Sequence, residues 1–358
     1  MYIESLDLKN FRNYEELHLT FDRGINVFFG DNAQGKTNIL EAQYVCATSR
    51  SHRGSKDREM IRFGQEEAHL RMEIRKQDIP GRIDMHFHPG KSRGIAIGGI
   101  PIRKASELFG VIHVVCFSPE DLGIVKNGPA ERRQFLNMEL CQLDRGYVSD
   151  LLTYNKVLQQ RNQLLKDLYF RPDLEDTLVV WDEQLIKSGR EIIKKRRKFV
   201  KELNTIIRDI HLGLSGGREE LFLTYEPDIE EEDFRDELIR NRETDKKMKT
   251  TVTGPHRDDV GFQVNDINIR KYGSQGQQRS AALSLKLSEI ELVKKKTGDS
   301  PVLLLDDVLS ELDSGRQENL LGVLSGIQAF ITCTGLDDFV SHSFHIDRLF
   351  QVNSGKVN

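Results

Sequence analysis

A glycine-rich segment near the start of the chain has the residue types needed to hold a phosphate group. Residues 30–37 read Gly-Asp-Asn-Ala-Gln-Gly-Lys-Thr and fit the pattern GxxxxGK(S/T) at every fixed position. Glycines let backbone N–H groups surround phosphate oxygens, and the dipole of a following helix favours their negative charge. The sequence therefore predicts a nucleoside triphosphate site formed by Gly30, Asp31, Asn32, Ala33, Gln34, Gly35, Lys36, Thr37 and Asn38.

A pair of carboxylates far along the chain suits the metal ion that accompanies such a nucleotide. Residues 302–305 are apolar and run directly into Asp306 and Asp307. A buried strand would place these acids at the carboxyl edge of a sheet, beside the phosphate loop. We expect the Thr37 hydroxyl and Asp306 to hold Mg²⁺, Asp306 through water. Lys36 is expected to reach the β- and γ-phosphates, and Asp307 to orient or deprotonate an attacking water.

The segment 274–279, Ser-Gln-Gly-Gln-Gln-Arg, leads into a helical pattern shortly before the acidic strand. A serine and a glycine at a helix N-terminus form an anion site with backbone donors. Within its own subunit this site has no phosphate to bind once the phosphate loop is filled. Ser274, Gly276 and Gln277 are therefore expected to cover the nucleotide of a second copy, which predicts an ATP-dependent head-to-tail homodimer; a glutamine-rich turn is the alternative.

The periodicity along the chain indicates two lobes. Strands and the phosphate-loop helix alternate in residues 1–118, helical spacing dominates residues 119–248, and strands return in residues 249–358. The expected fold is α/β, an ATPase lobe in two parts with a mainly helical lobe inserted between them.

Composition excludes several other classes of protein. No apolar run approaches the roughly 20 residues of a membrane span, and no signal peptide is evident, which predicts a cytoplasmic protein without a membrane partner. The four cysteines are scattered, as in a reduced core. His86 and His88 share a face of an expected strand, but the sequence ties no carboxylate or cysteine cluster to them.

The net charge of −4 means that DNA binding would need a local basic surface. Two clusters are candidates, and each could equally be an ordinary solvated face. One is the loop with Arg50, Arg53 and Lys56; the other is a helical stripe formed by Arg190, Lys194, Arg197 and Lys201. Because no base-reading module is apparent, binding should be independent of sequence and weaken steeply with salt.

Four motifs in this order resemble the head of ABC, SMC and Rad50 ATPases. They are the phosphate loop, residues 274–279 as a degenerate LSGGQ signature, the acidic strand end, and residues 310–313 as a D-loop with Asp313 at the nucleotide. Segments 8–14, 117–122, 128–137 and 253–259 are similar to hallmarks of the RecF family of DNA replication and repair proteins. The resemblance implies ATP, Mg²⁺, DNA gaps and junctions, RecR with RecO as partners, and RecA loading as the task.

Two departures from transporter-type ABC sites predict slow hydrolysis that acts as a release switch. The second acid is Asp307 where those sites carry Glu, and residues 330–334 offer hydroxyls in place of a switch histidine. Gln65 is the candidate for the glutamine that completes Mg²⁺ or water positioning in this class, and a solvated loop glutamine is the alternative. A transporter nucleotide subunit and a Rad50-like head that scaffolds a nuclease are the competing functions.

Overall fold

The computed structural model describes residues 1–335 and 345–358, which form two compact units. One unit contains Met1–Asp121 and Leu283–Asn358, and the other contains Leu122–Ala282. The sequence placed the return to the first lobe at residue 249, but the structure places it at Leu283. The physical reason is that the segment 259–264 pairs with the segment 221–226 inside the second unit.

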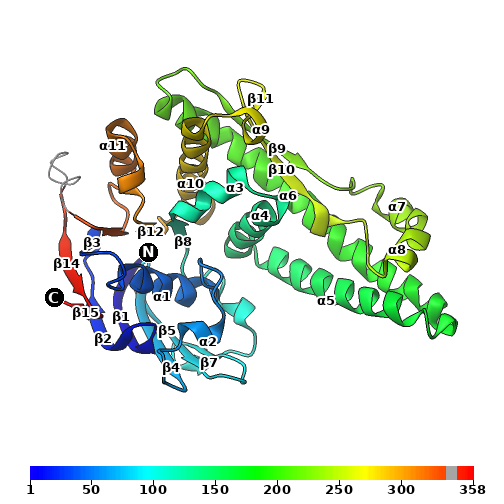
Figure 1. Ribbon diagram of the computed structural model, residues 1–358, viewed down its shortest axis with the longest axis horizontal. Coiled ribbons are helices and arrows are strands. Elements are labelled where there is room, and N and C mark those ends of the chain that lie inside the picture. Colours follow the sequence, from blue (N-terminus) through cyan, green and yellow to red (C-terminus); the bar gives the residue numbers. More distant parts are fainter. Residues whose placement is uncertain (336–344) are drawn as a thin grey trace. The chain divides into compact units, whose positions relative to one another are not determined.

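A six-stranded sheet forms the centre of the first unit (Figure 1). Its strands, in spatial order, are β15 (Lys356–Val357), β14 (Arg348–Asn353), β3 (Ile25–Phe29), β13 (Ala329–Cys333), β12 (Val302–Asp306) and β8 (Val114–Phe117). The strands from β14 to β8 run parallel to one another, and β15 is antiparallel to β14. Strands β12 and β13 are buried along their whole length, as expected for strands covered on both faces. The buried strand that was expected to end at the acidic pair is thereby confirmed.

Aromatic packing holds the phosphate-loop strand in this sheet. Phe28 of β3 stacks on Phe350 of β14 with ring centroids 4.9 Å apart. Phe21, which precedes β3, packs edge-on against Phe330 of β13 at 4.8 Å. These contacts fix β3 between two strands that come from the last part of the chain.

A second six-stranded sheet of the first unit is antiparallel. Its strands, in spatial order, are β2 (Tyr14–Thr20), β1 (Tyr2–Phe11), β4 (Ala68–Lys76), β5 (Ile79–Phe87), β6 (Gly94–Ile97) and β7 (Ile100–Pro101). Burial alternates along β4, so this sheet has one buried face and one solvent face. Helix α1 (Lys36–Thr48) packs against strands of both sheets, and this explains why 11 of its 13 residues are buried.

The remaining elements of the first unit are short or flank the sheets. They are α2 (Asp57–Met60), η1 (Ala105–Leu108), η2 (Pro119–Asp121), η5 (Leu309–Glu311) and α11 (Ser314–Val323). Helix α10 (Gln275–Thr297) begins in the second unit, and the division between the units falls inside it.

The second unit is mainly helical, as predicted. Its helices are α3 (Leu122–Lys126), α4 (Pro129–Leu143), α5 (Arg145–Asp167), η3 (Pro172–Thr177), α6 (Leu178–Leu214), α7 (Phe234–Arg240), α8 (Arg242–Met248), η4 (Pro255–Arg257) and α9 (Ile269–Tyr272). Helices α5 and α6 lie side by side (Figure 1). Strands β9 (Leu221–Glu226), β10 (Asp259–Val264) and β11 (Ile267–Asn268) form a small antiparallel sheet, and β9 packs on α6.

Buried ion pairs stabilise the interior of the second unit. Arg196 of α6 is 2% exposed and donates 2.7 Å to the Asp258 carboxylate. Arg161 of α5 is fully buried between Asp182 and Asp245. The segment 253–259, a family hallmark in the sequence, therefore holds this unit together through Asp258.

Among the described residues, no helix is both long and apolar enough to cross a membrane.

Candidate active site

The segment 30–35 forms a tight loop between β3 and α1, where the motif requires it. Gly30 has φ +146° and Gly35 has φ +117°, backbone conformations that side chains rarely adopt. A Cβ at position 30 would lie 2.3 Å from the carbonyl oxygen of Val352, and one at position 35 would lie 2.6 Å from Asn13 Nδ2. Both glycines are therefore required by backbone conformation and by close neighbours.

Two turns from distant parts of the chain support this loop. In the β1–β2 turn, Asn13 Nδ2 donates 2.9 Å to the Gln34 carbonyl, and the Tyr14 hydroxyl donates 3.1 Å to the Gly35 carbonyl. In the β14–β15 turn, the Ser354 N–H donates 2.6 Å to Gln34 Oε1. Hydrogen bonds within the protein therefore fix the loop on both sides.

Lys36 is buried at the start of α1. Its ammonium group donates 2.5 Å to the carbonyl of Gly30 and 2.8 Å to that of Asp31. The charge therefore lies over the turn of the loop, where a lysine can contact the outer phosphates of a bound nucleotide.

Three side chains meet at the carboxyl end of β12. Asp306 Oδ1 accepts 2.8 Å from the Thr37 hydroxyl and 2.7 Å from the Thr332 hydroxyl. Burial alone would raise the pKa of the Asp306 carboxyl, but contacts with His52 and both threonines outweigh it and lower the pKa. A neighbouring carboxylate and hydroxyl are hard oxygen ligands of the kind Mg²⁺ takes, and their separation suits adjacent positions around that ion.

Asp307 has a different environment from its neighbour. Its backbone is in the left-handed region, with φ 53°, and its N–H donates 2.9 Å to the Thr332 hydroxyl. Burial and the charge of Asp306 raise the pKa of the Asp307 carboxyl, with Lys36 acting in the opposite direction. Two adjacent acids whose pKa values shift in opposite directions suit two different roles, a metal ligand and a proton acceptor.

Thr332 is a site residue whose role the sequence did not reveal. It was noted only as a hydroxyl where other members of the class have histidine. In the structure it bonds to both acids at once, through Asp306 Oδ1 and the Asp307 N–H. Its position at the end of β13, the strand beside β12, was the available signal.

His52 is a second residue that the motifs did not identify. Its side chain is 6% exposed, and its Nε2 lies 3.8 Å from Asp306 Oδ2, too far for a direct hydrogen bond. Among the described residues neither ring nitrogen has a hydrogen-bond partner, and the ring packs edge-on against Tyr44. The histidine belongs to the same loop as Arg50 and Arg53.

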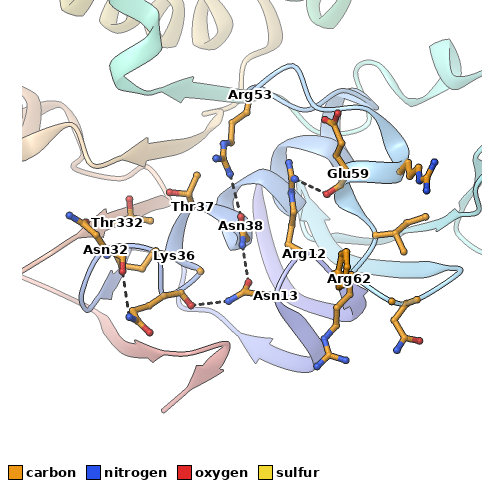
Figure 2. Close-up of a pocket in the computed structure, with 18 of the residues that line it drawn as sticks. Arg12, Asn13, Asn32, Lys36, Thr37, Asn38, Arg53, Glu59, Arg62 and Thr332 are labelled. Atoms are coloured by element: carbon orange, nitrogen blue, oxygen red, sulfur yellow. Dashed lines mark hydrogen bonds between the residues drawn. The ribbon is translucent and has the colours of Figure 1, made fainter.

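A cavity of about 1270 Å³ lies at the phosphate loop (Figure 2). Its lining includes the phosphate loop, Asp307 and Thr332, and also Arg53, Arg58, Arg62, Phe63 and Gln65. Gln65 is exposed and belongs to this lining, and its expected role at Mg²⁺ or at the attacking water stays a prediction. Arg53 reaches Asn38 Oδ1 at 3.4 Å, which puts one of the DNA candidates at the nucleotide cavity.

Arg12, also in the lining, connects the β1–β2 turn to α1. Its guanidinium makes a two-pronged contact with Glu41, at 2.7 and 2.6 Å, and Glu41 is fully buried. Burial alone would raise the pKa of the Glu41 carboxyl, but hydrogen bonds from Arg12 and Ser51 hold it below its usual value. The sequence pointed to residues 8–14 only through resemblance.

The signature segment lies in the second unit, at the N-terminus of α10. The Ser274 hydroxyl accepts from the Gln277 N–H at 3.2 Å, and Gln277 Oε1 accepts from the Ser274 N–H at 2.9 Å. This reciprocal pair is a capping box, so both side chains stabilise the helix start. Gly276 is exposed.

In the first unit Asp313 caps α11, where it accepts from the Arg316 N–H at 3.0 Å.

The helical basic cluster is only partly available to a partner. Arg190 donates to the carbonyls of Glu231 and Glu232, and Arg197 pairs with Glu230. Lys194 and Lys201 are exposed. In the loop cluster, Arg50, Arg53 and Lys56 are all exposed.

A phosphate loop after a central parallel strand, with paired acids ending another strand of the same sheet, defines an ATPase head of the SMC kind. A family model described as an AAA domain matches residues 5–299. A solved SMC head bound to the C-winged helix domain of ScpA covers 100% of this chain and 96% of its own, with a TM-score of 0.58. At 15% identity, that likeness concerns the fold alone.

Closer relatives identify the family. A protein of Agathobacter rectalis described as DNA replication and repair protein RecF is 60% identical over 357 residues, covering 100% of this chain and 99% of that protein. A solved structure of the recombination mediator protein RecF-ATP in the RecFOR pathway is 36% identical, with a TM-score of 0.94 over 100% of this chain and 97% of that one. The chain belongs to the RecF family of DNA replication and repair proteins. The two competing functions, a transporter subunit and a nuclease scaffold, are thereby set aside.

Proposed function

We propose that the chain binds ATP with Mg²⁺ at the cavity around the phosphate loop and uses it as a switch for assembly on DNA. The observation that carries this proposal is that the hydroxyls of Thr37 and Thr332 both donate to Asp306 beside the phosphate loop. Lys36 bonds to a carbonyl of that loop. The relatives solved with ATP and with an ATP analogue support the choice of nucleotide.

Within this proposal each part of the site has one task. Backbone N–H groups of the loop and Lys36 bind the phosphates, while Thr37 and Asp306 hold Mg²⁺. The cation, when bound, supplies charge neutralisation at the β- and γ-phosphates. Asp307, with its raised pKa, accepts the proton of the attacking water, and Thr332 keeps both acids oriented. Gln65 lies in the cavity lining and is proposed to position that water.

A second copy completes the site in this scheme. Ser274 and Gly276 are exposed at the start of the 23-residue helix α10, where backbone donors and the helix dipole favour an anion. Gln277 and Asp313 are the further residues proposed to reach the partner's nucleotide. ATP therefore joins two heads, and hydrolysis separates them. We expect hydrolysis to be slow, because the site has Thr332 in place of a switch histidine.

The assembly acts on DNA without reading its sequence. The exposed cations of the loop, Arg50, Arg53 and Lys56, and those of α6, Lys194 and Lys201, are proposed to contact phosphates. Arg190 and Arg197 contribute less, because residues 230–232 already engage them. RecR with RecO, and through them RecA, are the partners expected from the family.

Sedimentation velocity with ATP, ADP or no nucleotide, repeated with gapped DNA, tests the proposal. The wild type should dimerise only with ATP and Mg²⁺. Lys36→Ala should lose nucleotide binding and dimer together, whereas Ser274→Arg should bind ATP and remain monomeric. A wild type that stays monomeric at saturating ATP with DNA would refute the cross-subunit site, and ATP binding by Lys36→Ala at wild-type affinity would refute the nucleotide assignment.

Salt dependence tests the DNA part separately. The affinity of the ATP-bound protein for gapped DNA should fall steeply between about 50 and 200 mM salt. Lys194→Ala with Lys201→Ala should make that slope shallower, and Lys246→Ala, a lysine engaged by Glu175, is the matched control. An unchanged slope in the double variant would assign DNA contact to the loop cluster instead.

A further inference from the structure

Three side chains of metal-ligand type gather on the solvent face of the antiparallel sheet of the first unit. His69 of β4 and His86 of β5 are register partners, and their strand neighbours Leu70 and Met85 point into the core. Glu67 precedes His69 by two residues, so it lies on the same face. The sequence tied no carboxylate to His86, and the structure brings one to it.

The contacts among the three are close and specific. His86 Nε2 lies 3.0 Å from one Glu67 oxygen, and His69 Nε2 lies 3.5 Å from the other. The imidazole rings stack with centroids 4.2 Å apart and an interplanar angle of 7°. All three potential ligand atoms lie within 4.8 Å of one another.

These distances match the edges of a zinc coordination tetrahedron. Zinc–nitrogen and zinc–oxygen bonds of about 2.0–2.1 Å place neighbouring ligands about 3.3–3.4 Å apart. The two observed N···O distances, one to each oxygen of the Glu67 carboxylate, bracket that value. We propose that Glu67, His69 and His86 bind Zn²⁺ or a similar borderline divalent cation, with water completing the shell.

The surroundings favour this class of cation. Each of the three side chains is about half exposed, at 44–51%, so a hydrated ion reaches the ligands directly. Two imidazoles with a single carboxylate suit zinc, copper or nickel rather than Mg²⁺ or Ca²⁺, which prefer oxygen ligands. Arg71, on the same face, is engaged by Asp84 at 2.8 Å.

The position of this site gives it a consequence for the nucleotide cavity. Residues 63–66, immediately before Glu67, line that cavity, and so does Pro89, three residues after His86. A cation held by both strands would join the two segments and restrain this wall, which includes Gln65. Only this consequence depends on the proposed function; metal binding itself does not.

Metal binding is tested with the full chain, without a histidine tag and stripped of metal. Calorimetric titration with Zn²⁺ should show one equivalent bound. His69→Ala and His86→Ala should each weaken binding at least about tenfold, because each removes one of three ligands. His18→Ala is the matched control, since His18 lies on the same sheet but pairs with Asp7 at 2.6 Å. Unchanged far-UV circular dichroism shows that each variant folds.

Cysteine thiolates are strong zinc ligands that the chain also carries, and Co²⁺ distinguishes them from imidazole and carboxylate ligands. Substituting Co²⁺ for Zn²⁺ should give an absorption spectrum without a thiolate charge-transfer band. The proposal is overturned if Zn²⁺ shows no saturable binding below about 1 mM, if the spectrum has that band, or if His69→Ala with His86→Ala binds Zn²⁺ like the wild type. ATP affinity measured with and without Zn²⁺ tests the effect on the cavity wall.

Discussion

The buried pair of Arg12 and Glu41 gives the sharpest test of how the phosphate loop is positioned. In Arg12→Ala the Glu41 carboxylate, fully buried in α1, loses both prongs of its contact with the guanidinium. Leaving one member of a buried ion pair unpaired costs about 3–5 kcal/mol. Arg12 is itself 16% exposed, and Ser51 still donates 2.5 Å to Glu41, so we expect the lower end, about 3 kcal/mol.

This loss of stability is measured by urea unfolding, followed by circular dichroism. Hydrogen exchange of the α1 amides measures the local effect. Arg71→Ala is the control, because it breaks an exposed pair with Asp84 and should cost below about 1 kcal/mol. Arg12→Met combined with Glu41→Met should be more stable than Arg12→Ala, since no charge remains buried. The reasoning fails if Arg12→Ala costs as little as Arg71→Ala, or if the double variant is the least stable of the three.

Three further results are expected. Thr332→Val keeps the side-chain shape but leaves the Asp307 N–H unpaired, so stability should fall by about 2 kcal/mol. The Mg²⁺-dependent affinity for ATP should also drop, because Asp306 loses a hydrogen bond. An ATP affinity that is unchanged in calorimetry would contradict this. Asp307→Asn should bind ATP and accumulate the dimer in sedimentation, and full ATPase turnover by this variant would exclude Asp307 as the proton acceptor. The pKa of Glu41 is lowered on folding, so its contribution is present above its usual value near 4.5 and is lost as pH falls through the folded pKa. The stability advantage of wild type over Glu41→Gln should therefore shrink below about pH 5, and an advantage that grows in acid would reverse the assigned sign.

The sequence was sufficient where the chemistry follows one continuous segment. Gly30–Thr37 and the pair Asp306–Asp307 could be identified because glycines, lysine and acids lie next to one another with strong flanking strands. Thr332 could not be given its role, since its partnership with Asp306 depends on which strand lies beside β12. His52 and Glu67 were missed for the same reason: Asp306, which lies near His52, and His86, which contacts Glu67, are on other strands.

For the basic helix α6 the error is the opposite one. The sequence pattern predicted more cations available to DNA than the structure has. Charge spacing alone placed Arg190 and Arg197 on one stripe with Lys194 and Lys201. The stripe is real, but the backbone carbonyls and the carboxylate of residues 230–232 already occupy both arginines. Arg196, in the same run of charges, is a core residue paired with Asp258. A charge run cannot reveal these partners, because the helix that carries it packs against segments more than 30 residues away.

The order of strands around β3 also has a consequence for synthesis of the chain. Both sheet neighbours of β3 come from residues 329–353, so the strand that begins the phosphate loop has none until nearly the whole polypeptide has been made. At about 5–20 residues per second, β3 waits on the order of 15–60 s after leaving the ribosome. During that time β3 is an exposed apolar segment with unpaired backbone groups. Chaperones that bind unfolded chains would be expected to bind there. ATP can bind a finished site only after the last strands have closed around the first.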